Sequence, residues 1–140
     1  MDLSDALTYA APIRRGVLAT VKSDGRPQLS NIMFAVGADG VIRISVTDSR
    51  AKTANIRRDP RVSLHVTSGD FWSYAVIEGD AALSAVASEP DDDTVDQLVA
   101  LYRDLGGDHP DWDEYRAAMV EDGRLVLSIR PSRAYGMLPG

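Results

Sequence analysis

The sequence predicts a single mainly β domain with peripheral helices (α+β class), in which six antiparallel strands form a barrel or a curled sheet. Two observations carry this prediction. Stretches in which apolar and polar residues alternate recur along the chain, most clearly over residues 41–46 and 61–67. Tight turns such as Asp24-Gly25 join neighbouring stretches, because Gly tolerates the positive φ that hairpin turns require. Short turns of this kind favour antiparallel neighbours over a parallel α/β sheet.

The predicted elements follow in hairpin order. Ser4 is the expected N-cap of a first helix over residues 5–10, which Pro12 ends. A short helix over 51–58 stops at Asp59-Pro60. A third helix is expected after the acidic run 91–93, and a fourth over 112–122. Strands are expected over 16–22, 27–36, 41–46, 61–67, 72–83 and 124–130.

Composition and charge narrow the classes of function. The chain has 140 residues, of which 44% are hydrophobic and 26% charged, and this fits one domain over 1–140. The absence of cysteine excludes disulfides and thiolate chemistry and agrees with a reducing compartment. A net charge of −6 disfavours nucleic acid as a partner. No signal peptide or membrane span is readable, so a cytoplasmic protein without a membrane partner is expected.

The start of the helix over 51–58 carries an unusual pair of charges. Arg50 and Lys52 stand where the helix dipole disfavours cations by about 0.3–1 kcal/mol each. An anion bound there would turn this conflict into a set of converging donors, with the hydroxyls of Ser49 and Thr53 beside them. The residues alone leave an alternative open, in which the basic side chains extend into solvent or pair with Asp48 or Asp59.

Two further clusters have the chemistry of a ring-binding site. The first, Gln28-Leu29-Ser30-Asn31, offers donors and acceptors that suit the edge of a uracil-like ring, or else forms a solvent-facing strand edge. The second places Trp72 and Tyr74 on one face of a strand, where they could flank a planar ring or pack in a core or dimer interface. Neither His65 nor His109 has a partner at metal-binding spacing, so no metal site is expected.

The order of these clusters resembles the pyridoxamine 5′-phosphate oxidase-like split β-barrel family. The resemblance covers about residues 13–135, and segments 16–21, 24–27 and 49–61 carry it, with Ser49-Arg50-Ala51-Lys52-Thr53 as its most specific part. Segments 72–76, 78–79, 91–95 and 101–103 resemble the actinobacterial branch of this family that uses the deazaflavin coenzyme F420.

The resemblance implies an FMN-binding-like split β-barrel that forms a homodimer with two cofactor sites at the subunit interface. The basic residues would grip the cofactor phosphate, the strand at 28–31 would lie against the ring, and Trp72 and Tyr74 would come from the partner subunit. The cofactor-binding residues so implied are Gln28, Ser30, Asn31, Ser45, Thr47, Ser49, Arg50, Ala51, Lys52, Thr53, Asn55, Trp72, Ser73 and Tyr74.

The resulting functional hypothesis is an F420-dependent oxidoreductase that transfers a hydride between the reduced deazaflavin and an unsaturated organic small molecule. Tyr74 is a candidate proton donor, and no other catalytic residue is assigned. Arg57, Arg58 and Arg61 could hold an anionic cofactor tail or could be ordinary helix-end charges. Two alternatives remain open: an FMN-dependent oxidoreductase of the same family, and a non-catalytic protein that carries F420 or a flavin.

Overall fold

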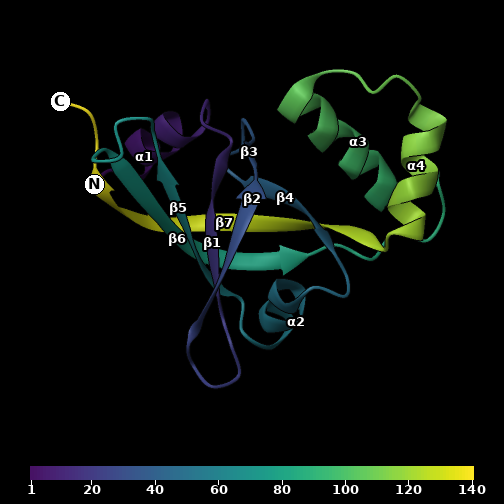
Figure 1. Ribbon diagram of the computed structural model, residues 1–140, viewed down its shortest axis with the longest axis horizontal. Helices are drawn as coiled ribbons and strands as arrows, with labels where there is room; N and C mark the ends of the chain where they lie inside the picture. The colour runs from purple at the N-terminus through teal and green to yellow at the C-terminus, as the bar shows by residue number, and fades with distance from the viewer.

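Seven antiparallel strands form one curled sheet in the computed structural model, which describes residues 1–140 (Figure 1). The order across the sheet is β2-β1-β5-β6-β7-β4-β3. This confirms the predicted mainly β fold class with peripheral helices. The strands are β1 (Arg15–Val21), β2 (Pro27–Met33), β3 (Ala35–Val36), β4 (Ile42–Thr47), β5 (Arg61–Thr67), β6 (Tyr74–Leu83) and β7 (Arg124–Met137).

The strand count differs from the prediction because the expected strand over 27–36 is broken at Phe34. Its first part, β2, pairs with β1, and its second part, β3, pairs with β4 at the opposite edge of the sheet. The Phe34 side chain is fully buried, and its backbone N–H donates to the Arg14 carbonyl at 2.9 Å. One chain segment therefore runs from one edge of the sheet to the other, and the sheet curls far enough for β2 to contact β4.

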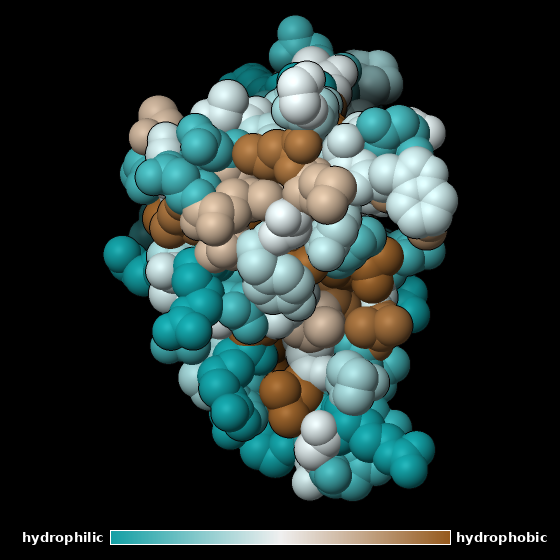
Figure 2. Space-filling model, turned by 90° about the vertical axis from the view of Figure 1, so that its left-hand side faces the viewer, coloured by the Kyte–Doolittle hydropathy of each residue, from teal (hydrophilic) through white to brown (hydrophobic).

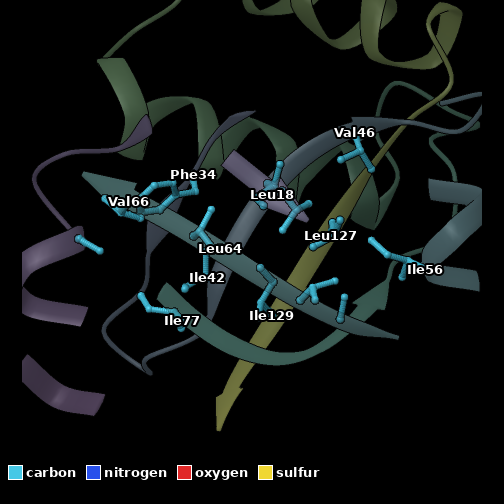
Figure 3. Close-up of a cluster of buried hydrophobic side chains, with 14 of the residues drawn as sticks. Leu18, Phe34, Ile42, Val46, Ile56, Leu64, Val66, Ile77, Leu127 and Ile129 are labelled. Carbon is cyan, nitrogen blue, oxygen red and sulfur yellow. The ribbon is translucent and has the colours of Figure 1, made fainter. Parts of the chain in front are cut away.

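The barrel interior contains the apolar residues that the alternating pattern predicted to face inward. The side chains of Val62, Leu64 and Val66 in β5 are buried, as are those of Ile42, Ile44 and Val46 in β4. Figure 3 shows how side chains from most strands and from α2 meet in this cluster. Each buried aliphatic side chain contributes roughly 1.5–3 kcal/mol through removal of apolar surface from water.

Four helices surround the sheet, and none of them is long and apolar enough to cross a membrane. They are α1 (Leu3–Ala10), α2 (Ala51–Arg58), α3 (Asp93–Gly106) and α4 (Trp112–Glu121). The Asp2 carboxylate caps α1 by accepting from the Asp5 N–H at 3.2 Å, so the predicted Ser4 cap is wrong. Figure 1 shows α3 and α4 together at one end of the sheet, with α1 and both termini at the other.

The last strand is longer than predicted, because Pro131 does not end it. A register shift in β6 between Glu78 and Gly79 lies at this point, and Gly79 faces Pro131 across the ladder. A bulge of this kind tolerates the missing N–H of proline. Beyond it, β7 continues to Met137 and pairs with the start of β6, so that five more residue positions of β7 face residues 74–78.

We predict that Phe34→Ala lowers the free energy of unfolding by about 3–5 kcal/mol, because the fully buried ring leaves a cavity at the strand break. The measurement is urea denaturation followed by far-UV circular dichroism. Leu29→Ala is the matched control in β2, since 63% of the Leu29 side chain is exposed. Equal losses in the two variants would contradict the central role of Phe34.

Candidate functional site

Three basic side chains converge on one hollow between the start of α2 and the end of α3, both labelled in Figure 1. They are Arg50, Lys52 and Arg124, and the hollow has a volume of about 510 Å³. No aspartate or glutamate lines it, although the chain has 21 acidic and 15 basic residues. Its remaining walls are residues 30–33 of β2, residues 45–47 of β4 and Leu105 of α3. We call it the basic hollow.

The backbone explains why these charges meet. Strand β4 ends at Thr47 and α2 begins at Ala51, so Arg50 is the N-cap residue and Lys52 lies in the first turn. The buried Thr53 hydroxyl donates to the Thr47 carbonyl at 2.8 Å and fixes the helix start against the strand end. Arg124 faces Thr47 in the β4–β7 ladder, and this pairing brings the third charge to the same place.

Nearby carboxylates do not neutralise the basic hollow, because each has another partner. Asp48 pairs with Arg57 at 2.6 Å, and Asp59 pairs with Arg61 at 2.7 Å. The alternative in which Asp48 or Asp59 pairs with Arg50 or Lys52 is therefore wrong for this structure.

The same contacts bear on the basic residues at the end of α2. Arg57 and Arg61 are engaged in those ion pairs, while Arg58 donates to the Val21 carbonyl at 3.1 Å and to the Asn55 side chain at 2.9 Å. None of the three lines the basic hollow. Arg57 and Arg58 are helix-end charges and Arg61 begins β5, and the structure gives no support to their holding a cofactor tail.

The electrostatics of the basic hollow favour an anion. Burial, followed by the positive charges of Arg50 and Arg124, lowers the pKa of Lys52 from its usual 10.5. The Nε atom of Arg124 is buried and has no hydrogen-bond partner. Unsatisfied buried donors and like charges both cost free energy. A phosphate, sulfate or carboxylate would relieve both costs, and the residues present therefore fit an anionic group.

The hollow gathers part of the predicted set of site residues. Arg50 and Lys52 line it, with Ser30, Asn31, Ser45 and Thr47. Ser49 and Ala51 flank Arg50 in the chain without lining the hollow, and Gln28 does not line it either. The Thr53 hydroxyl is engaged with Thr47, and the Asn55 amide donates to the Thr20 hydroxyl at 3.0 Å inside the protein. The sequence reasoning missed Arg124, because only the strand register brings it close.

The predicted aromatic residues lie elsewhere in the chain. Trp72 is not in a strand: β6 begins at Tyr74, and a turn runs through Phe71, whose φ is +68°. The expectation that Trp72 and Tyr74 share one strand face is therefore wrong. The Trp72 side chain is 77% exposed, and none of Trp72, Ser73 and Tyr74 lines the basic hollow.

Hydrogen bonds hold the aromatic turn in place. The Tyr9 hydroxyl donates to the Ser73 carbonyl at 2.9 Å and accepts from the Ser68 N–H at 3.0 Å. The Asp70 carboxylate accepts from the Ser73 N–H at 2.8 Å and from the Ser73 hydroxyl at 3.0 Å. The Phe71 and Trp72 rings pack edge to face with centroids 5.3 Å apart. This turn presents an ordered aromatic pair to the outside.

The outer face of the sheet exposes further apolar side chains. Met33, Tyr135 and Met137 are 48%, 52% and 64% exposed, and the strand register places them on the same face as Tyr74 and His65. Figure 2 shows apolar side chains reaching the surface on the side of the molecule that carries the two termini. Tyr135 and Met137 lie two residues apart on β7, and exposed apolar neighbours of this kind indicate a contact surface.

Comparison with known proteins agrees with this geometry. The sequence model of the pyridoxamine 5′-phosphate oxidase family matches residues 8–138. A conserved hypothetical protein of Mycobacterium tuberculosis has a similar crystal structure, with 25% identity, coverage of 96% of this chain and 82% of that chain, and a TM-score of 0.72. A structure described as an F420 reductase has 26% identity, covers 94% of both chains and has a TM-score of 0.67.

The heme storage protein of Vibrio cholerae shares the fold at 16% identity, with coverage of 97% of this chain and 95% of that chain and a TM-score of 0.67. At that identity the likeness concerns the fold alone. Proteins with this fold are thus described with different ligands, F420 in one case and heme in the other. The residues of the basic hollow, and not the fold, must therefore carry the functional argument.

We predict that Lys52→Met raises the free energy of unfolding in anion-free buffer, because it removes a partly buried charge beside two like charges. The folded-state pKa of Lys52 is lowered, so its cost is fully present below that pKa and fades as the pH rises towards 10.5. The advantage of the variant should shrink over that alkaline window in urea denaturation. Inorganic phosphate should stabilise the wild type more than the variant. A less stable variant in anion-free buffer at neutral pH would contradict the burial cost.

Proposed function

The chain belongs to the pyridoxamine 5′-phosphate oxidase family, and on this premise we propose that it is an F420-dependent oxidoreductase. In this proposal the protein transfers a hydride between the reduced deazaflavin and an unsaturated organic small molecule. The basic hollow is the observation that carries the proposal, because three unpaired cations there fit the phosphate of such a cofactor. The F420 reductase of similar structure supports the choice of deazaflavin.

Different residues of the basic hollow would bind the phosphate and the ring of the cofactor. Arg50, Lys52 and Arg124 would hold the phosphate, and the hydroxyls of Ser45 and Thr47 offer further polar contacts in the same hollow. Ser30 and Asn31 would orient the ring along β2, where both line the hollow. When bound, the reduced cofactor supplies the hydride. The protein then has to fix the distance and orientation of the substrate and to exclude water.

Two alternatives compete with this function. FMN presents the same phosphate to the same residues, so an FMN-dependent oxidoreductase would use the basic hollow unchanged. A carrier protein would bind the cofactor without turnover. Reduced cofactor mixed with enones, quinones and tetrapyrroles separates a carrier from an enzyme, because a carrier oxidises it with none of them.

We further propose that the active form is a homodimer in which the part of the outer face that carries Tyr135 and Met137 packs against a second copy. The exposed apolar side chains there would leave water on dimerisation. Trp72 and Tyr74, which do not line the basic hollow of their own chain, could then reach the cofactor of the other copy. Tyr74 stays a candidate proton donor in such an assembly.

For the cofactor, we predict that F420 binds to the wild-type protein and that Lys52→Ala weakens this binding by about 1.5–3 kcal/mol, the contribution of a hydrogen bond to a charged group. Titration followed by cofactor fluorescence measures the effect. Lys22→Ala is the matched control, because Lys22 is exposed at the β1–β2 turn and is the other lysine of the chain. Tight binding of FMN without binding of F420 would contradict the choice of cofactor.

For the assembly, we predict that sedimentation at micromolar concentration gives the mass of a dimer and that the double variant Tyr135→Asp/Met137→Asp gives a monomer. The introduced carboxylates would lose their hydration in the contact. The free-energy cost of this desolvation is far larger than the free energy gained by burial of the apolar surface. The double variant Gln97→Asp/Ala100→Asp places the same charge on the exposed side of α3 and should leave the dimer intact. A monomeric wild type would contradict the interface.

A further inference from the structure

A second hollow adjoins the basic hollow along β2. It has a volume of about 460 Å³, and the two hollows share residues 31–33 as a common wall. We call it the β1–β5 hollow. Its other lining side chains are Arg15, Val17, His65 and Thr67.

The strand register explains the floor of the β1–β5 hollow. Val17 of β1 faces Asn31 of β2 on one side and His65 of β5 on the other, so the three side chains form a row on one face of the sheet. The Tyr74 ring from β6 stacks on the His65 ring, with centroids 5.6 Å apart and planes 27° apart. The His65 ring, held by Tyr74 beneath the lining, and the apolar Val17 and Met33 give the hollow a surface that suits a planar molecule.

The β1–β5 hollow is positively charged through Arg15. Arg15 makes no ion pair and no side-chain hydrogen bond within the chain, and no aspartate or glutamate lines the hollow. A guanidinium with free donors binds a carboxylate through two parallel hydrogen bonds.

We propose that the β1–β5 hollow binds the acceptor substrate and that Arg15 recognises an anionic group on it. The substrate class is then planar, conjugated carboxylates. The inference rests on the proposed function only in naming the bound molecule an acceptor. The shared wall at residues 31–33 places that molecule next to the cofactor ring that the proposed function puts along β2. Binding energy from the carboxylate would fix the orientation of the conjugated part.

Cinnamate is the probe, because it is a flat conjugated carboxylate, and cinnamyl alcohol is its uncharged counterpart. The experiment uses the full chain in phosphate-free buffer, because phosphate would compete with the carboxylate of the probe for Arg15. Proton NMR follows the imidazole signals of the two histidines. His65 lines the hollow, whereas His109 packs against Tyr102 near α3 and serves as an internal reference.

We expect cinnamate to shift the His65 signals while those of His109 stay unchanged. Arg15→Gln should weaken cinnamate binding at least about tenfold, the factor that one hydrogen bond to a charged group supplies. Arg26→Gln is the matched control, because Arg26 is exposed at the β1–β2 turn and does not line the hollow. Cinnamyl alcohol should bind the wild type weakly and should not distinguish Arg15→Gln from it.

Other results would overturn the inference. Binding that Lys52→Ala abolishes and Arg15→Gln preserves would place cinnamate in the basic hollow. Unshifted His65 signals at saturation would exclude the β1–β5 hollow. The proposed function is judged separately by the F420 titration: if neither F420 nor FMN binds but cinnamate still depends on Arg15, the hollow stands and the proposed function fails. If F420 binds and cinnamate does not, only the hollow fails.

Discussion

The meeting of Arg50, Lys52 and Arg124 in one hollow without a carboxylate is the constraint around which the functional end of this protein is arranged. Burial and two like charges all disfavour the ammonium group. This arrangement does not stabilise the fold, because an apolar side chain at position 52 would avoid the electrostatic cost. Functional sites are where proteins accept such costs. The hydrogen bond from Thr53 to Thr47 and the β4–β7 ladder hold the charges together in the absence of a ligand.

The surroundings of the basic hollow preserve this charge. Asp48 and Asp59 lie within a few residues of it in the chain, but each is paired with an arginine outside it. These ion pairs are largely exposed, so they contribute little to stability. Their greater effect is to keep two carboxylates away from Arg50 and Lys52. The end of α2 thus supports the site indirectly, by engaging the acids that would otherwise neutralise it.

The sequence was sufficient for features that depend on neighbours in the chain. The bounds of α2 and the inward faces of β4 and β5 followed from charge, proline and alternation, because these signals act over a few residues. The break at Phe34 could not be predicted, since it depends on closure of the sheet by two distant edges. Arg124 was missed for the same reason: 77 positions separate it from Thr47, and only the register joins them.

The aromatic turn illustrates a different limit of sequence reasoning. The alternation around Trp72 and Tyr74 resembles a strand, but Asp70 accepts hydrogen bonds from Ser73 and the chain turns instead. Local side-chain acceptors of this kind compete with strand pairing and leave no trace in the hydrophobic pattern. This turn also affects the proposed function. Because the turn points Trp72 outward, its own chain cannot use it at the basic hollow, and any contact with a cofactor has to come from a second copy. An ordered, exposed aromatic pair and a hollow that lacks an aromatic wall are complementary features, and a symmetric dimer is the simplest assembly that would join them twice.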